Sequence, residues 1–175
     1  MVIWLIGLSG VGKTTIGRRL HVLWQTTAAN TVFVDGDEIR KIFGAGQFNH
    51  EYSLAGRRRN AERITAICSW LDRQDINVVA CVLSVFQDNR DWNRENYSDY
   101  FEVFIDAPME VLRKRHPRDL YGMAERGEMP NVVGVDIPWT PPLKSDLVID
   151  NGDEADDADA LAKRILDAAM AKALA

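Results

Sequence analysis

The sequence has only two cysteines and no apolar run long enough to cross a bilayer. Cys68 lies in a helical pattern and Cys81 in an apolar strand pattern, with no C-x-x-C and no paired histidine spacing. We expect both to be small core residues rather than metal ligands or a disulfide. The apolar start is too short for a signal peptide and lacks a basic n-region. These absences predict a soluble, cytoplasmic protein with no membrane partner.

The chain also lacks the basic surplus of a nucleic-acid-binding protein, since its formal net charge is −5. Eight acidic and three basic residues follow position 144, which leaves eighteen of each sign before it. We interpret the acidic end as a solvated helix face. Basic residues cluster at Arg57-Arg58-Arg59 with Arg63 and at Arg113-Lys114-Arg115 with Arg118. Such clusters predict an anionic small-molecule substrate rather than a nucleic acid.

With 175 residues and 46% hydrophobic content, the chain fits one domain, residues 1–175, with a substantial core. Apolar, β-branched segments alternate with helical patterns, which predicts an α/β fold with a parallel sheet covered on both faces. The strands are expected at Val2–Ile6, Thr31–Val34, Asn77–Leu83, Phe101–Ile105 and Asp146–Ile149. The helices are expected at Lys13–Thr27, Glu38–Phe43, Leu54–Gln74, Asn89–Tyr97, Met109–Arg115, Leu120–Arg126 and Glu154–Leu174. A Pro- and Gly-rich stretch, residues 127–143, completes a candidate lid at about 116–143.

A complete G-x-x-x-x-G-K-[ST] run lies between the first predicted strand and the first helix. This context is typical of a phosphate-binding P-loop, in which glycines let consecutive backbone N–H groups surround a polyphosphate. Lys13 would neutralise phosphate oxygens and the Thr14 hydroxyl would hold Mg²⁺. The alternative is a glycine-rich turn of another function. The predicted ATP-binding residues of this run are Gly7, Leu8, Ser9, Gly10, Val11, Gly12, Lys13, Thr14 and Thr15.

Asp35 and Asp37 flank a glycine directly after the second predicted strand. If the strand continued that far, both side chains would point the same way. One carboxylate could then hold Mg²⁺ through water while the other accepts a proton from an attacking hydroxyl. The alternative is a turn in which Asp37 caps the following helix. Because ligands collect at the carboxyl ends of parallel strands, we favour the functional interpretation.

Arg57 and Asn60 are three positions apart on a predicted helix and would share a face. Their pairing suits an anionic group with a polar edge, and Arg40 lies one turn after Asp37. At least one of Arg58 and Arg59 is expected to be solvated, because adjacent helical residues cannot all face one site. Tyr52 is either a surface aromatic or a platform on which a base stacks, and the residues alone leave both open.

The whole pattern up to about Asn151 resembles the adenylylsulfate kinase family, whose members have a P-loop fold. The resemblance implies transfer of the γ-phosphoryl group of ATP to the ribose 3′-hydroxyl of adenylylsulfate, with Mg²⁺. The matching motifs are Gly7–Thr14, Asp35-Gly36-Asp37-x-x-Arg40, Tyr52-Ser53-x-x-x-Arg57-x-x-Asn60, Ser84-x-Phe86, Phe101–Pro108, Leu120-Tyr121 and Gly134-Val135-Asp136.

By position, the resemblance makes Asp37 the base at the acceptor hydroxyl and places Asp35 close to the metal, with Thr14. Arg115 matches an arginine near the ATP side, at the base of the lid. The catalytic pair is then Asp37 and Lys13. The implied acceptor-site residues are Asp35, Arg40, Tyr52, Arg57, Asn60, Ser84 and Phe86.

The departures from the family pattern gather on the acceptor side. Glu38 replaces the usual Asn, Val85 the usual Pro, and Gly56 the usual Asp. Gly122 replaces a lid lysine, and Val132 stands where a lid aromatic closes the second face of the adenine. Relatives of the family phosphorylate other nucleotide 3′-hydroxyls, among them a cytidine diphosphoramidate kinase.

The sequence therefore predicts an ATP-dependent kinase acting on an anionic nucleotide, with adenylylsulfate or a pyrimidine nucleotide such as cytidine diphosphoramidate as acceptor. A GTPase-like switch or non-catalytic nucleotide-binding module is the alternative class. No Asn-Lys-x-Asp motif is present, and the D-x-x-G of Asp119–Gly122 lies in a helical pattern rather than at a strand end. A homodimer is compatible with this interpretation.

Overall fold

A five-stranded parallel sheet forms the centre of the computed structural model, which describes residues 1–43, 49–115, 119–153 and 157–174. The strand order is β2-β3-β1-β4-β5, and every neighbouring pair is parallel. The strands are β1 Val2–Ile6, β2 Thr31–Asp35, β3 Asn77–Val82, β4 Tyr100–Asp106 and β5 Leu147–Asp150. The predicted α/β class and parallel sheet are confirmed.

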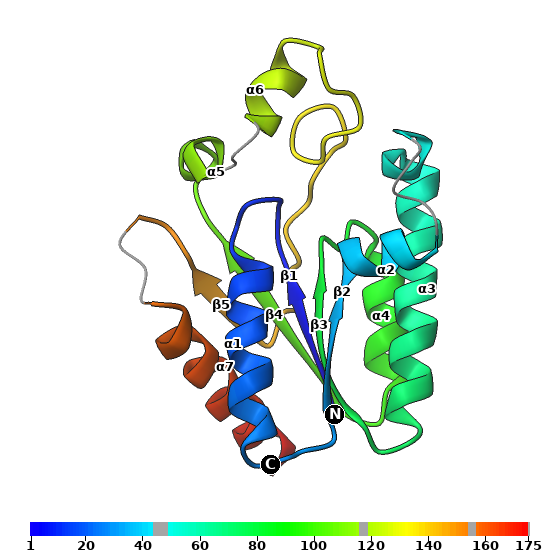
Figure 1. The fold of residues 1–175 in the computed structure, drawn as a ribbon, viewed down its shortest axis with the longest axis vertical. Helices are drawn as coiled ribbons and strands as arrows, with labels where there is room; N and C mark the ends of the chain where they lie inside the picture. The colour runs from blue at the N-terminus through cyan, green and yellow to red at the C-terminus, as the bar shows by residue number, and fades with distance from the viewer. Residues whose placement is uncertain (44–48, 116–118, 154–156, 175) are drawn as a thin grey trace.

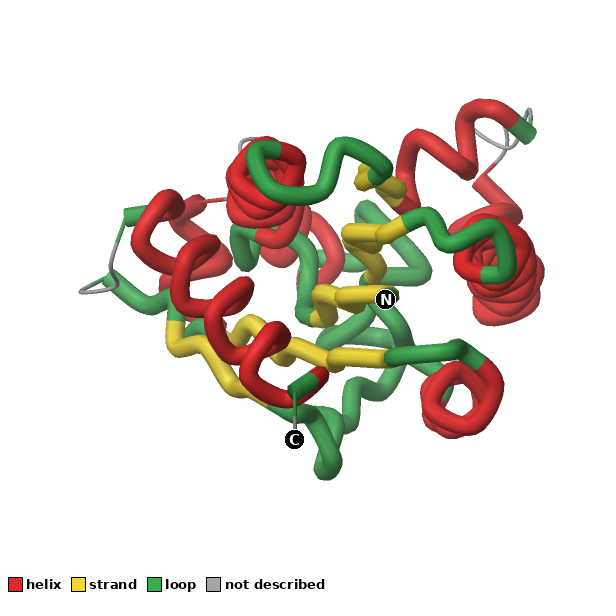
Figure 2. Tube along the Cα trace, turned by 90° about the horizontal axis from the view of Figure 1, so that it is seen from below, coloured by secondary structure: helices red, strands yellow, loops and turns green. Residues whose placement is uncertain are grey.

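Helices cover both faces of this sheet (Figure 1, Figure 2). The longer ones are α1 Lys13–Gln25, α3 Leu54–Asp72, α4 Gln87–Asn96 and α7 Ala158–Ala173. The shorter ones are α2 Gly36–Ile42, the 3₁₀ turn η2 Asn49–Tyr52, α5 Met109–Arg115 and α6 Leu120–Glu125. In the described part of the chain, none of the helices combines the length and hydrophobicity needed to cross a membrane.

The central strand β1 is completely buried and supplies both layers of the core. Ile3 and Leu5 join the cluster that includes α1 and α7, whereas Trp4 joins the cluster on the α3 side. This division follows from the alternation of side chains along a strand. A strand covered on both faces is apolar at every position, which explains the continuous apolar run at the N-terminus.

The two cysteines lie on opposite faces of the sheet. Cys68 belongs to the α3-side cluster and Cys81 to the other, and both are buried free thiols. The expectation that they are core residues is confirmed, and burial raises the pKa of both thiols well above the usual range.

The topology places the site at the carboxyl end of β1. From β1 the chain first builds β2 and β3 on one side, and only later β4 and β5 on the other. Ligands bind at such switch points because the connections leave the sheet in opposite directions and open a crevice. The loop after β1, α5 and α6 all lie toward this end of the sheet (Figure 1).

Candidate functional site

The loop from Gly7 to Gly12 joins the end of β1 to the first turn of α1. Gly12 is the N-cap residue of α1 with φ 96°, and an added Cβ would lie 2.6 Å from Nδ2 of Asn151. Only glycine combines this left-handed backbone with such a close neighbour. No side chain caps α1 and no acid lies in its first turn, so its first N–H groups face the loop with their dipole uncompensated. The segment thus has the geometry of an anion cradle.

Lys13 lies beside the cradle and is half-buried. Its Nζ donates to the carbonyl oxygens of Gly7 and Leu8, both at 2.8 Å. Burial lowers the pKa of this ammonium from 10.5 to about 8, against the opposing fields of Cys81, Asp37 and Asp35. A half-buried cation held by neutral carbonyls gains strongly from an incoming anion.

Asp35 joins the phosphate cradle to α2. It is the N-cap of α2, where one carboxylate oxygen accepts from the backbone N–H groups of Asp37 and Glu38. The other oxygen accepts from Oγ1 of Thr14 at 2.8 Å. The two predicted metal-site oxygens are therefore in direct contact.

Asp37 is placed differently from the sequence expectation. The strand ends at Asp35 and Gly36 begins a helix, so Asp37 does not continue the alternation of β2 but lies in the first turn of α2. The expectation that Asp37 could cap this helix was also wrong, because Asp35 has that role. Helical geometry nevertheless leaves Asp37 exposed on the wall of the same cavity as Asp35.

A cavity of about 760 Å³ extends from the P-loop across the ends of β2 and β3. This volume falls within the range of small-molecule and cofactor sites. It brings together all the predicted acceptor-side residues: Asp35, Arg40, Tyr52, Arg57, Asn60, Ser84 and Phe86. It also includes P-loop residues Ser9, Gly10, Gly12, Lys13, Thr14 and Thr15.

Two guanidinium groups flank the ring of Tyr52. The Arg40 guanidinium carbon lies 4.7 Å from the ring centroid and that of Arg57 lies 5.9 Å from it. Burial lowers the pKa of the Arg57 guanidinium, with the neighbouring charge of Arg40 as the second cause. Two cations held this close would be stabilised by an anion between them.

Several buried polar atoms in the cavity wall have no hydrogen-bond partner among the residues that the structure describes. They are Nε of Arg40, Nε of Arg57, Oδ1 of Asn60 and Oγ of Ser84. The Asn60 amide is fixed by its Nδ2, which donates to the Gly36 carbonyl at 3.0 Å. Because buried polar groups are ordinarily satisfied, this convergence indicates a polar ligand.

Gly56, where the family usually has Asp, permits a close approach of η2 to α3. A Cβ at this position would lie 2.5 Å from both Cα and the carbonyl oxygen of Glu51. Any side chain here would therefore displace the turn that carries Tyr52. The position of the Tyr52 ring therefore depends on glycine at position 56, where the family usually has Asp.

The two arginines after Arg57 point away from the cavity. Arg58 lies over the ring of Phe86, 3.7 Å from its centroid, and forms an ion pair with Asp88 at 2.7 Å. Arg59 is about half-exposed and forms an ion pair with Glu51 at 2.9 Å. The expectation that at least one of them is solvated is confirmed for Arg59, whereas Arg58 supports the Phe86 ring from behind.

The candidate lid lines the cavity opposite α3, through Leu120 and residues 129–133. Residues 116–118 of the predicted segment lie outside the described residues. Arg57 donates to the Asn131 carbonyl at 2.8 Å, and Asp136 accepts from the backbone N–H groups of Asn131 and Val132. Val132 is buried in the core and presents only a small aliphatic side chain to the cavity.

Arg115 lies outside this cavity, in a second one of about 340 Å³ shared with P-loop residues Gly10, Gly12 and Thr15. It donates to the carbonyl oxygens of Asn151 and Gly152 at 2.6 and 2.7 Å. Sequence reasoning missed Asn151, whose Nδ2 donates to the Val11 carbonyl at 2.8 Å. The strand-end rule could have found it, because Asn151 directly follows β5.

Sequence comparison identifies relatives along most of the chain. Residues 1–150 match the model of the family described as adenylylsulphate kinase. The cytidine diphosphoramidate kinase of Campylobacter jejuni is 37% identical over 150 residues, 86% of this chain and 85% of that protein. The adenylyl-sulfate kinase of Paraburkholderia xenovorans is 33% identical over 150 residues, 85% of this chain and 82% of that protein.

Comparison with solved structures gives the same result. The APS kinase CysC of Mycobacterium tuberculosis, solved in complex with AMPPNP and APS, superposes with a TM-score of 0.81 at 26% identity, covering 95% of each chain. A shikimate kinase from Aquifex aeolicus, with a TM-score of 0.62 and 22% identity over 99% of each chain, shares the fold alone. The predicted P-loop kinase fold is confirmed and the GTPase-like alternative finds no support. The chain belongs to the adenylylsulphate kinase family and is a kinase.

Proposed function

We propose that this kinase transfers the γ-phosphoryl group of ATP to the ribose 3′-hydroxyl of a nucleotide that carries an anionic group, and that cytidine diphosphoramidate is a better acceptor than adenylylsulfate. The observation that carries the proposal is the cavity wall described above. The Arg40 guanidinium, the half-buried Arg57 guanidinium and the unpartnered polar atoms line the same cavity as the P-loop. The anionic group of a nucleotide acceptor could pair with the guanidinium groups, and its other polar groups could hydrogen-bond to the unpartnered atoms.

The residues of the cradle are suited to hold the donor. Lys13 and the N–H groups of the loop offset the charge that develops on the transferred phosphoryl group, and they do so without rearrangement in a buried site. Arg115, with Asn151 and Gly152, frames the second cavity on the ATP side. Residues 116–143 act as a lid that excludes water once both substrates are bound.

Asp37 is the proposed base at the acceptor hydroxyl. It lies on the cavity wall between the P-loop and the arginines, and its exposed carboxylate is free of the capping role that occupies Asp35. A carboxylate there can orient the 3′-hydroxyl in line with the γ-phosphorus and accept its proton.

Thr14 and Asp35 would hold Mg²⁺. Their oxygens already lie 2.8 Å apart beside the cradle, and hydroxyl, carboxylate and phosphate oxygens are the ligands that this ion prefers. When bound, the ion supplies positive charge to the phosphate oxygens. Thr14 and Asp35 would keep the ion beside the cradle.

The preference for a pyrimidine rests on the lid. Val132 stands where the family has the lid aromatic, so, among the lid residues that the structure describes, no aromatic side chain stacks on the second face of a base that lies on Tyr52. Stacking on one aromatic residue is worth about 1–3 kcal/mol per base, and a purine has more ring surface to leave uncovered than a pyrimidine. The 37% identity to the C. jejuni kinase points in the same direction.

The test is a coupled ADP-release assay in which the purified protein receives ATP, Mg²⁺ and one acceptor at a time. The acceptors are cytidine diphosphoramidate, adenylylsulfate, and a panel of CDP- and UDP-linked nucleotides. Lys13→Ala is the control and should lose activity on every acceptor without any fall in its thermal unfolding temperature.

We expect kcat/KM for cytidine diphosphoramidate to exceed that for adenylylsulfate. A value for adenylylsulfate in the ordinary enzyme range of about 10⁴–10⁸ M⁻¹s⁻¹, above every pyrimidine nucleotide, would contradict the preference and restore the plain family activity. Absence of transfer to all of them would contradict the proposed reaction itself.

A further inference from the structure

The backbone at Ser84 has an unusual conformation for a residue with a side chain. Its φ is 55°, in the left-handed region, two residues after β3 ends at Val82. Such a conformation persists only where the surrounding structure holds it in place, and it occurs preferentially at functional sites. Ser84 lines the large cavity, and its buried hydroxyl has no partner among the described residues.

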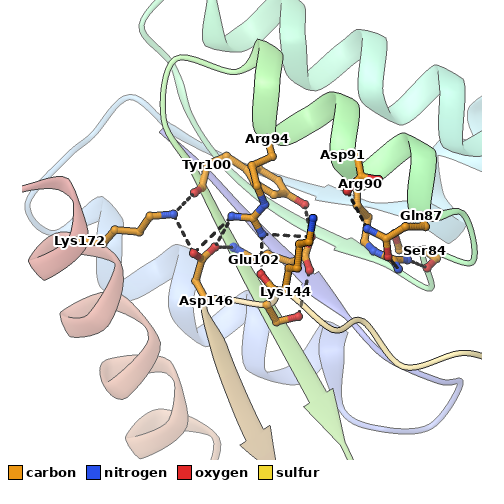
Figure 3. Close-up of polar contacts among 11 residues, drawn as sticks. Ser84, Gln87, Arg90, Asp91, Arg94, Tyr100, Glu102, Lys144, Asp146 and Lys172 are labelled. Atoms are coloured by element: carbon orange, nitrogen blue, oxygen red, sulfur yellow. Dashed lines mark hydrogen bonds and ion pairs between the residues drawn. The ribbon is translucent and has the colours of Figure 1, made fainter.

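Arg90 contacts the carbonyl of this strained residue. Its guanidinium donates to the Ser84 carbonyl oxygen at 2.7 Å and to Oε1 of Gln87, whose own amide donates to Asp91 at 2.8 Å (Figure 3). Arg90 is 3% exposed, although it does not line the cavity. A charge-assisted bond from a planar, buried guanidinium fixes a carbonyl in both distance and direction.

No ion pair to Arg90 is found among the residues that the structure describes, which sets it apart from its neighbour on α4. Arg94 pairs with Asp146 at 3.2 Å and donates to the Lys144 carbonyl at 2.9 Å, so it ties α4 to the sheet (Figure 3). Burying a cation against neutral acceptors is costly. Arg90 makes hydrogen bonds to the Ser84 carbonyl and to Gln87, the first residue of α4.

We infer that Arg90 is a positioning residue for phosphoryl transfer: it holds Ser84 in its left-handed conformation and so presents the Ser84 hydroxyl and the following Phe86 ring to the reacting groups. This inference rests on the proposed function. Arg90 touches neither substrate, and its effect passes through the segment 83–87. Displacing a positioned group by about 1 Å can cost about 10²-fold in rate.

The kinetic test compares R90Q, R90K, S84A and the double variant R90Q/S84A, with R94Q as the matched control on the same helix. For R90Q we expect kcat/KM for the acceptor to fall about 10- to 100-fold while KM for ATP stays within about twofold. R90K, which keeps the charge and part of the hydrogen bonding, should recover part of that loss. Because Arg90 acts through Ser84, the double variant should be little worse than the worse single variant.

R94Q should lower thermal stability and leave kcat/KM for the acceptor within about threefold of wild type. The acceptors are cytidine diphosphoramidate and adenylylsulfate. Three results would overturn the inference, because each is expected of a purely structural arginine. In the first, the losses of R90Q and S84A add in the double variant. In the second, R90Q impairs kcat/KM for ATP as much as kcat/KM for the acceptor, and in the third, R94Q lowers kcat/KM for the acceptor as much as R90Q does.

A crystal structure of R90Q separates this inference from the proposed reaction. We expect φ of Ser84 to leave the left-handed region once its carbonyl loses the guanidinium. If φ stays near 55° in R90Q, Arg90 does not hold the conformation and the inference fails, whatever acceptor the wild-type protein uses. If the conformation changes but wild type transfers phosphate to no nucleotide, the proposed function fails and the positioning role stands.

Discussion

At the level of single residues, the charged groups of the site differ in how many hydrogen-bond partners they have. Lys13 is half-buried, and among the described residues its ammonium donates to two carbonyls, whereas Asp35 is engaged as a cap and a hydrogen-bond acceptor. Asp37, two residues later, has an exposed carboxylate on the same wall. This contrast separates Asp35, which caps α2 and is proposed to hold Mg²⁺ with Thr14, from Asp37, whose carboxylate is available for proton transfer.

The division predicts different behaviour for the two carboxylates. Asp37→Asn should lower kcat by about 10²–10⁴-fold with little change in ATP affinity, because general-base help acts on the acceptor hydroxyl. Steady-state kinetics and ATP titration measure the two quantities. Asp35→Ala is the comparison and should also lower thermal stability, since it removes the side-chain cap of α2, at a cost of about 1 kcal/mol. Near-normal turnover of Asp37→Asn would assign the proton transfer elsewhere.

The lowered pKa of Lys13 predicts a pH dependence of ATP binding. Above its pKa of about 8, Lys13 of the free protein is neutral, so binding a polyphosphate that favours the ammonium must take up a proton. ATP affinity should therefore weaken as pH rises above about 8. Calorimetry in two buffers with different ionisation heats should show proton uptake at about pH 9 and little at about pH 7. Equal uptake at both would contradict the assignment.

The lowered pKa of Lys13 also affects the free energy of unfolding of the ATP-free protein, which should rise with pH where ATP affinity falls. Because the folded-state pKa of Lys13 is below its unfolded value of 10.5, the unfolded chain binds more protons between these two pH values. The Lys13 contribution therefore destabilises the fold below pH 8 and is relieved as pH rises toward 10.5. Lys13→Ala, which removes this group, should flatten that part of the stability profile.

At the scale of elements, the acceptor side depends on how η2 packs against α3. Gly56 provides the space, and η2 carries Tyr52 between the two arginines. Arg40 of α2 and Arg57 of α3 both lie near the Tyr52 ring that this turn carries. The acceptor side of the cavity is thus made by the contact of α2, η2 and α3 rather than by any one of them.

Gly56→Ala tests this packing. The added Cβ would lie 2.5 Å from the Glu51 backbone, so η2 must shift. Overpacking of this kind costs about 1–3 kcal/mol, and the shift of Tyr52 should raise KM for the acceptor more than KM for ATP. Ala55→Ser, at the exposed preceding position, is the control and should change neither. Equal KM values for wild type and Gly56→Ala would contradict the role of the turn.

At the scale of the whole molecule, the parts of the site are joined across the switch point of the sheet. α6 reaches back to the P-loop through Tyr121, whose hydroxyl donates to the Ser9 carbonyl at 2.8 Å. Burial raises the pKa of Tyr121 to about 12, so the hydroxyl stays a donor at neutral pH. The lid is therefore linked to the donor side by Tyr121 and to the acceptor side by the Arg57–Asn131 contact.

Tyr121→Phe should loosen the donor-side link. We expect the free energy of unfolding to fall by about 1 kcal/mol and KM for ATP to rise a few-fold, because the loop loses a contact that orders its Ser9 carbonyl. Tyr97→Phe is the matched control, since its buried hydroxyl donates to the Thr65 carbonyl away from the cavity. That control should lose similar stability with KM for ATP unchanged; a parallel change in KM would show that the effect is not local.

The fold class and the cradle could be predicted from the sequence, because both depend on local patterns. A continuous apolar strand followed by Gly7–Thr14 and a helix leaves few alternatives, and the strand-end rule brought out Asp35, Asp37 and Ser84. The predicted acceptor-side residues do line one cavity. The same rule would have reached Asn151 had β5 been considered.

Which of these residues are free to act could not be predicted from the sequence, because it depends on how distant segments pack. Whether Asp35 or Asp37 caps α2 depends on where β2 ends, and that is set by its pairing with β3. The support of Phe86 by Arg58 and of Ser84 by Arg90 joins residues whose helical spacing gives no sign of a shared role. Motifs made of neighbouring residues can be recognised in the sequence. Burial, and with it the loss of hydrogen-bond partners, arises only when separate segments pack together.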